Sequence, residues 1–272
     1  MRYILNFSCE DEICAATLDT ASGGTGLLIV SGGNEIRAGA HAGMARLAAH
    51  LSARGIPVFR FDRRGVGDSG GENDGFTASA ADIAAAAAAF RAACPHVSRL
   101  IGFGNCDAAT ALAFFHNDAR LDALILSNPW AVENDDGLPP PGAIRRHYAR
   151  RLRDPAAWRA LQRGRIDLGK LALGLSRAAH PASAQPLVMR LAAALTDAPP
   201  AQIILAERDM TAMAFAAEWR KPPFATARAR ISVTTVPTAS HGFAGPGDED
   251  RLFAIILKAI GELSTLDSPP VD

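Results

Sequence analysis

The sequence predicts an α/β fold built on a mostly parallel sheet, and three observations support this expectation. Continuous apolar runs recur at residues 26–30, 57–61, 97–103 and 121–127, and their lack of alternation is typical of strands covered on both faces. Helical segments separate these runs, which favours parallel strands joined by right-handed crossovers. The composition is 49% hydrophobic and 21% charged, which is typical of a globular protein. We therefore expect a doubly wound sheet.

The first half of the chain supplies most of this sheet. Residues 2–7 and 13–18 flank the acidic turn 10–12 and predict an antiparallel N-terminal pair of strands. The apolar runs named above predict four further strands. Between them, the residue patterns predict helices over 41–54, 78–93 and 107–115.

The alternation of strands and helices stops after residue 131. The segment 132–200 opens with the proline-rich stretch Leu138–Pro141 and contains helical patterns without a strand-like run. We expect a helical cap, or lid, inserted over the carboxyl ends of the strands. The alternation then resumes with strands at 201–206 and 230–236 and helices at 211–219 and 248–263. The expected organisation is a core over 1–131, a cap over 132–200 and the rest of the core over 201–272.

Charge and cysteine usage exclude several function classes. Lys+Arg and Asp+Glu both number 28, so no global field favours nucleic acid or an anionic membrane. The four cysteines, Cys9, Cys14, Cys94 and Cys106, show no zinc-ligand spacing, and we expect neither a metal nor a cofactor. A signal peptide and a long apolar run are both missing, so the expected protein is cytoplasmic, with reduced thiols and no stable membrane insertion. A Cys9–Cys14 disulfide across the hairpin is the less favoured alternative.

The stretch Gly104-Asn105-Cys106-Asp107-Ala108 joins a predicted strand to a predicted helix. Small residues two positions on either side of a central nucleophile are typical of a nucleophile elbow, where the strand turns sharply into the helix. Cys106 is therefore the candidate nucleophile. By itself the pattern is weak, because a single cysteine is most often a buried small hydrophobic residue.

Candidates for the acid and the base follow the last two predicted strands. Asp209 lies in the loop after 201–206, and His241 lies in the loop after 230–236. The order nucleophile, acid, histidine, each after a strand, predicts a catalytic triad. Glu207 is an alternative acid, and Asp209 could instead cap the following helix.

The remaining site candidates lie in neighbouring loops. The backbone N–H of Asp107 and that of Gly33 or Asn34 are the expected oxyanion-hole donors, since Gly32 and Gly33 carry no side chain that would block a substrate carbonyl. The aromatic residues Trp130 and Phe243 are candidates for contacting the substrate.

Two charged segments invite further interpretations. The loop 62–69 is rich in glycine but lacks P-loop spacing, so we interpret it as a rigid loop beside the site rather than a nucleotide site. The segment from Arg145 to Arg177 contains ten basic residues and two acidic residues. A solvated helix face is the simpler interpretation; contact with an anionic group of the substrate is the sharper one.

Together these motifs resemble the α/β-hydrolase superfamily. The resemblance is carried by Ser31-Gly32-Gly33, residues 61–69, the Cys106 elbow, Asp209 and Ser240-His241-Gly242-Phe243. More narrowly, the 62–69 loop and the cysteine elbow are similar to the hydrolase 1 family associated with the exosortase A system of exopolysaccharide-producing bacteria. The chain departs from the superfamily in having cysteine where serine is usual, and Ser31 where many members have histidine.

The resemblance and the site candidates together predict an enzyme that cleaves an ester or thioester of a small molecule through an acyl-cysteine intermediate. An acyltransferase that passes the acyl group to a hydroxyl acceptor is one alternative. A binding protein without catalytic activity is the other. The sequence does not indicate an oligomeric state.

Overall fold

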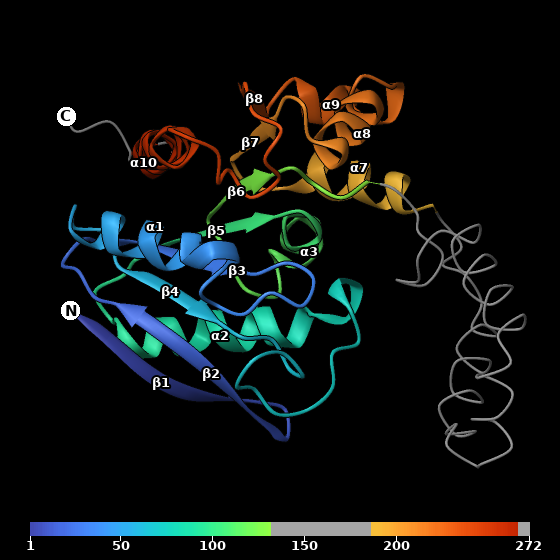
Figure 1. The fold of residues 1–272 in the computed structure, drawn as a ribbon. Coiled ribbons are helices and arrows are strands. Elements are labelled where there is room, and N and C mark those ends of the chain that lie inside the picture. The colour runs from blue at the N-terminus through green and yellow to red at the C-terminus, as the bar shows by residue number, and fades with distance from the viewer. Residues whose placement is uncertain (132–185, 266–272) are drawn as a thin grey trace, which may run out of the picture. The chain divides into compact units, whose positions relative to one another are not determined.

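The sheet has eight strands in the described part of the chain. The computed structural model describes residues 1–131 and 186–265, and the strand order is β1-β2-β4-β3-β5-β6-β7-β8 (Figure 1). β1 and β2 pair antiparallel, β2 pairs antiparallel with β4, and all other pairs are parallel. The strands are β1 Arg2–Cys9, β2 Glu12–Asp19, β3 Thr25–Val30, β4 Val58–Phe61, β5 Arg99–Asn105, β6 Ala123–Ser127, β7 Ala201–Ala206 and β8 Ser232–Val236. This arrangement confirms the predicted fold class.

Helices cover both faces of the sheet. The described helices are α1 Gly43–Ser52, α2 Ala80–Ala93, α3 Asp107–Phe115, α7 Leu187–Asp197, α8 Met210–Trp219, α9 Ala225–Arg228 and α10 Asp248–Thr265, with short 3-10 turns η1 Ala40–Ala42, η2 Phe76–Ala78 and η4 Pro222–Phe224. Buried side chains of α2, α3, α7 and α8 form one apolar core, and those of α1 and α10 form the other. Along β3, Leu28 and Val30 enter the first core while Leu27 and Ile29 enter the second. This division explains the continuous apolar run, because both faces of the strand are buried.

Most of the segment that interrupts the alternation of strands and helices lies outside the described residues. Residues 132–185 fall outside the described residues, and the predicted helical cap falls there with them. The unit that contains the sheet comprises Met1–Ala131 and the chain from Val188 onward. It therefore includes α7, whose Leu191 and Leu195 are fully buried in the first core, whereas the sequence placed residues up to 200 in the cap.

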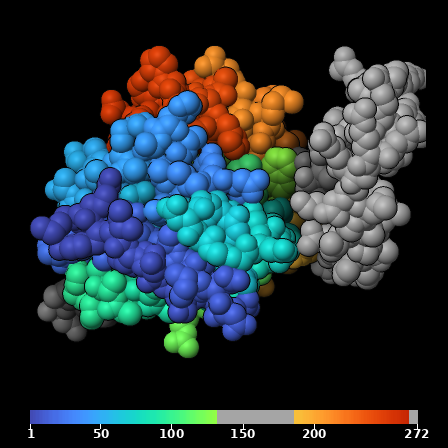
Figure 2. Space-filling model, turned by 60° about the horizontal axis from the view of Figure 1, so that its bottom comes forward, coloured from blue at the N-terminus to red at the C-terminus, as the bar shows by residue number. Residues whose placement is uncertain are grey.

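A long loop connects β4 to α2 and covers the turn between β1 and β2. The N–H of Gly70 donates to the carbonyl of Ile13 at 3.0 Å, and the Arg64 side chain is paired with Glu10 in the turn. Figure 2 shows this loop in cyan beside the dark blue N-terminal hairpin. Within residues 1–131 and 186–265, no helix combines the length and apolar character needed to cross a membrane.

Candidate active site

Cys106 lies at the junction between β5 and α3, in a backbone conformation that is rare for a residue with a side chain. Its φ and ψ are 62° and −128°. The neighbouring strand holds it there, since the Cys106 N–H donates to the Ser127 carbonyl at 2.9 Å and its own carbonyl accepts from the N–H of Trp130 at 3.2 Å. Strained backbone of this kind occurs at functional sites where surrounding structure enforces it. The geometry is that of a nucleophile elbow.

Gly104 allows the elbow to close. A Cβ at this position would lie 2.8 Å from the backbone carbon of Ala108 and 2.9 Å from the N of Ala109, closer than real Cβ contacts allow. The first turn of α3 therefore packs directly on the end of β5. This contact is the physical reason for the small residue that the sequence pattern contains.

His241 and Asp209 come together at the carboxyl end of the sheet. Nδ1 of His241 lies 3.0 Å from Oδ2 of Asp209. The same Oδ2 accepts the N–H of Ala212 at 3.0 Å and so caps α8. The sequence left two roles open for Asp209, and in the structure one carboxylate oxygen has both. Glu207, the alternative acid, is exposed and makes no such contact among the described residues.

Two asparagines that the sequence analysis missed hold the backbone of His241. Asn128 is fully buried, and its side-chain amide donates to the His241 carbonyl at 3.1 Å and to Oδ1 of Asn105 at 2.9 Å. The Asn105 amide donates to the same carbonyl at 3.2 Å. These bonds tie the loop after β8 to the ends of β5 and β6. The available signal was an asparagine as the last residue of β5 and another directly after β6.

The Cys106 thiol is protonated at neutral pH in this arrangement. Burial first, and then the carboxylates of Asp107, Asp209 and Glu35, together raise the pKa of Cys106 to about 12, against a lowering contribution from the Asp107 backbone N–H. Both Cys106 and His241 are described, yet no hydrogen bond joins Sγ to the imidazole. The described contacts therefore do not include a thiolate–imidazolium pair between Cys106 and His241. The base must act when the substrate is bound.

The predicted oxyanion loop is occupied by a side chain. The Gly33 N–H donates to both carboxylate oxygens of Asp107, at 2.8 and 3.0 Å. A Cβ on Gly32 would lie 2.5 Å from Oδ1 of Asp107. The open space that we expected to admit a substrate carbonyl therefore admits the Asp107 carboxylate instead. Its negative charge makes it a strong acceptor for this N–H.

Arg63 fixes the other side of the Gly33 peptide. It is 4% exposed, and its Nη2 donates to the Gly33 carbonyl. The loop 62–69 was expected to be a rigid neighbour of the site, and this contact shows how it reaches the oxyanion loop. No signal in the sequence distinguished Arg63 from Arg64, which points elsewhere.

The three remaining candidates have different surroundings. Asn34 is exposed, and its Oδ1 accepts from Asn73 at 2.8 Å. Trp130 is partly exposed next to the elbow, and its backbone supports Cys106. Phe243 is 2% exposed and packs in the second core. The ring of Phe243 is thus covered by protein in this structure, and its contact with a substrate stays a prediction.

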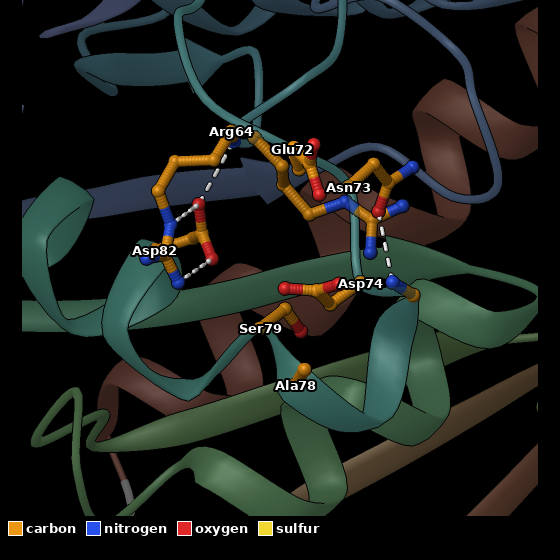
Figure 3. Close-up of a pocket in the computed structure, with 9 residues that line it drawn as sticks. Arg64, Glu72, Asn73, Asp74, Ala78, Ser79 and Asp82 are labelled. Carbon is orange, nitrogen blue, oxygen red and sulfur yellow. Dashed lines mark hydrogen bonds and ion pairs between the residues drawn. The ribbon is translucent and has the colours of Figure 1, made fainter. Parts of the chain in front are cut away.

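A small hollow on the surface lies beside Arg63 and Asn73. Figure 3 shows Arg64 and Asp82 pointing toward one another beside it, and the Arg64 side chain and backbone donate to both Asp82 oxygens at 2.8–3.1 Å. Its lining consists of Arg63, Arg64, Glu72, Asn73, Asp74, Gly75, Ala78, Ser79 and Asp82. None of the three triad candidates contributes to it.

Asp82 also lies beside two buried thiols. The ligand atoms of Cys9, Cys14 and Asp82 lie within 4.8 Å of one another, a cluster that linear spacing did not indicate. All four cysteines are free. Burial, followed by the Asp82 charge, raises the pKa of Cys9 to about 11, and Arg64 already engages the carboxylate. Protonated thiols are poor ligands, so we describe this cluster as a buried polar junction.

Comparison with known proteins adds a family to this geometry. A family model described as "Hydrolase_4: Serine aminopeptidase, S33" matches residues 27–180, which is more than half of the chain. The chain belongs to this hydrolase family. No curated protein matches the sequence.

Solved structures resemble the chain over most of its length. DcsB in complex with its substrate analogue shows 15% identity and a TM-score of 0.67, with 96% of this chain and 99% of that chain covered. The α/β hydrolase GrgF from Penicillium sp. sh18 shows 16% identity, a TM-score of 0.63 and coverages of 97% and 98%. The esterase Pf2001 of Pyrococcus furiosus shows 12% identity, a TM-score of 0.62 and coverages of 95% and 92%. These likenesses establish the α/β-hydrolase fold.

Proposed function

We propose that this protein hydrolyses an ester or thioester of a small molecule through an acyl-cysteine intermediate, with Cys106 as nucleophile, His241 as base and Asp209 as the acid that orients His241. The observation that carries the proposal is the strained Cys106 backbone at the β5–α3 junction, at the same end of the sheet as the His241–Asp209 pair. Membership of a hydrolase family and the likeness to an esterase favour this chemistry.

The proposed reaction has two steps. His241 takes the Cys106 proton as Sγ attacks the substrate carbonyl carbon, and it then gives that proton to the departing alcohol or thiol. His241 next takes a proton from water as the water oxygen attacks the thioester carbon. The bond from that carbon to Sγ then breaks, His241 returns the proton to Sγ, and the acid leaves. The Asp107 N–H and an N–H from residues 33–34 would stabilise each oxyanion. Because the pKa of Cys106 is raised, we propose that proton transfer accompanies attack.

Mass spectrometry of the acylated protein tests this proposal. Incubation with short p-nitrophenyl esters or acyl-coenzyme A thioesters should add one acyl group to Cys106, in step with p-nitrophenol or thiol release. His241→Ala should abolish acylation, while His96→Ala, a change to an exposed histidine whose Nε2 lies 2.9 Å from the Ala21 carbonyl, should preserve it. An unmodified Cys106 alongside turnover would exclude the acyl-cysteine route.

Two alternatives predict different outcomes of the same experiment. An acyltransferase would accumulate the acyl-cysteine until a hydroxyl acceptor is added. A binding protein would show neither adduct nor turnover. The resemblance to the exosortase-associated hydrolase 1 family leads us to propose sugar hydroxyls as the first acceptors to test. We also propose that the substrate carries an anionic group that binds arginines between residues 145 and 177. Those arginines lie outside the described residues.

A further inference from the structure

The Asp107 carboxylate occupies the Gly33 N–H, which is one of the two N–H groups, with that of Asn34, proposed above as the second oxyanion donor. Both of its oxygens accept the Gly33 N–H, and this N–H is one of the donors proposed for the substrate oxyanion. A substrate carbonyl oxygen can bind there only after the carboxylate has moved away. The free protein therefore has one of its proposed oxyanion donors blocked by its own side chain.

The surrounding contacts indicate that the side chain moves rather than the loop. Gly32 leaves the space in which Oδ1 of Asp107 lies, and Arg63, almost fully buried, donates to the Gly33 carbonyl. The backbone of Asp107 is fixed as the first residue of α3. Rotation about the two side-chain torsions of Asp107 is the small movement that frees the N–H.

The charge of the substrate determines what this movement costs. A neutral ester would leave the carboxylate without its donor, beside a carbonyl oxygen that becomes negative during the reaction. A negative charge next to the reacting carbonyl would add a further repulsion. A positive charge next to the carbonyl would instead pair with the displaced carboxylate. Asp209 and Glu35 also contribute negative potential at Cys106. This potential likewise favours a cation next to the reacting carbonyl.

We propose that Asp107 is a specificity-determining residue that selects acyl substrates with a positively charged group next to the reacting carbonyl, an inference that rests on the function proposed above. The cation draws the carboxylate from the Gly33 N–H and leaves that donor to the carbonyl oxygen. Pairing also offsets the charge that helps to raise the pKa of Cys106, so the same substrate makes its nucleophile easier to deprotonate.

Three p-nitrophenyl esters of similar shape test the preference. The alanyl ester carries an ammonium where the isobutyryl ester carries a methyl and the methylmalonyl ester a carboxylate. At about pH 6 the amine is charged, and each kcat/KM is divided by the uncatalysed rate. The alanyl ester should exceed the isobutyryl ester by about tenfold or more, the size of one charge-assisted hydrogen bond, and the methylmalonyl ester should be the poorest.

The variant D107N should remove this preference. The ratio of alanyl to isobutyryl hydrolysis should fall to near one, and isobutyryl hydrolysis should rise, because the repelling charge is gone. D118N removes the same charge from an exposed residue beyond the other end of α3 and should keep the wild-type ratio. An equal rate for both esters in the wild type, or a preference that survives D107N, would overturn the inference.

A second experiment does not depend on ester hydrolysis. Methanethiosulfonates modify Cys106 by attack of its thiolate on the thiosulfonate sulfur, which forms a mixed disulfide and releases methanesulfinate. The rate of modification by the trimethylammonium reagent is divided by the rate for the sulfonate reagent, and this ratio is divided by the same ratio for 2-mercaptoethanol. The resulting value should be high in the wild type and in D118N, and it should drop in D107N. If no ester acylates Cys106 but this ratio behaves as stated, the hydrolase proposal fails and the charge selection by Asp107 remains. Equal ratios in all three proteins would refute the selection.

Discussion

At Cys106, the backbone and the side chain are under different constraints. Hydrogen bonds from the end of β6 and from the N–H of Trp130 hold the backbone in its strained turn. The thiol is buried and lies near carboxylates, and both conditions disfavour its charged form. The strained turn therefore fixes the nucleophile in place without activating it, and activation depends on what binds beside it.

The reactivity of Cys106 should consequently rise with pH well beyond neutrality. Only the thiolate reacts with iodoacetamide, and a pKa of about 12 means that its fraction grows with each unit of pH. Alkylation of Cys106, followed by mass spectrometry, should accelerate by about tenfold per unit between pH 7 and 10 without a plateau. The D107N profile should lie at lower pH because a raising charge is removed. A plateau near pH 7 in the wild type would show that His241 has already formed a thiolate.

Gly32 is the second residue whose chemistry the structure specifies closely. In Gly32→Ala, the new Cβ would meet Oδ1 of Asp107 at 2.5 Å and the Asn105 carbonyl at 2.9 Å. The backbone contact cannot relax by side-chain rotation, so we expect a loss of about 1–3 kcal/mol in the free energy of unfolding. Gly43→Ala is the matched control, because its Cβ meets nothing within 4 Å and α1 gains a better helix former. Urea denaturation measures both, and equal stability of the two variants would contradict the expected clash.

At the level of elements, Asp209 connects α8 to the loop after β8. One oxygen caps the helix and accepts from His241, so the start of α8 determines where the imidazole lies. The two asparagines at the ends of β5 and β6 hold the same loop through the His241 carbonyl. The position of His241 is therefore set by the ends of β5 and β6 and by the start of α8, together with the hydrogen bonds that Ser240 makes within the loop.

Substitutions at Asp209 should separate its two roles. Asn retains an oxygen that can cap α8 but removes the charge that stabilises a protonated His241. D209N should keep most of the stability and lose at least about a hundredfold in kcat, whereas D209A should also lose about 1 kcal/mol of unfolding free energy. Glu207→Gln, in an exposed residue of the same loop, should change neither quantity. Full activity in D209N would remove Asp209 from the proposed triad.

For the whole molecule, the sequence predicted the strands and helices, because these depend on the local periodicity of apolar residues. The apolar runs located β3 to β7, because burial on most of both faces leaves a clear pattern. The more exposed β1 was found with β2 from the turn between them, and helical spacing located the main helices. The elbow was found for a similar reason, since Gly104 must be small for α3 to pack on β5. The end of the insertion was missed because α7 is amphipathic and resembles a cap helix as closely as a core helix.

The contacts that the sequence could not predict are long-range and polar. Nothing near Asp107 in sequence indicates that its carboxylate lies on Gly33, 74 residues away. Phe243 follows His241 closely, yet the φ of 54° at this residue accompanies a ring that packs in the core. Asn128 and Arg63 likewise have their partners on other strands and loops. Such pairings depend on the assembled sheet, and residue type alone leaves many possible partners.

Two ion pairs show how burial decides the contribution of such long-range contacts to stability. Asp62 is fully buried and accepts from the Arg37 side chain, the Arg37 N–H and the Asp68 N–H, joining the loop after β3 to the loop after β4. Arg46 of α1 and Glu249 of α10 form two bonds of 2.6 and 2.7 Å, but about half of the Arg46 side chain and a third of Glu249 are exposed. Water therefore screens the second pair and not the first.

We expect Asp62→Ala to lower the free energy of unfolding by about 3–5 kcal/mol, because it leaves buried donors and a partly buried guanidinium without their acceptor. Glu249→Gln should cost less than about 1 kcal/mol, and that cost should fade in about 1 M NaCl as screening shortens the range of the charges. The cost of Asp62→Ala should persist at the same salt concentration, because bulk ions do not reach the buried carboxylate. Urea denaturation at low and high salt measures both variants. A cost for Asp62→Ala that disappears in salt would mean that water already reaches this carboxylate, and that its bonds do not hold the two loops together.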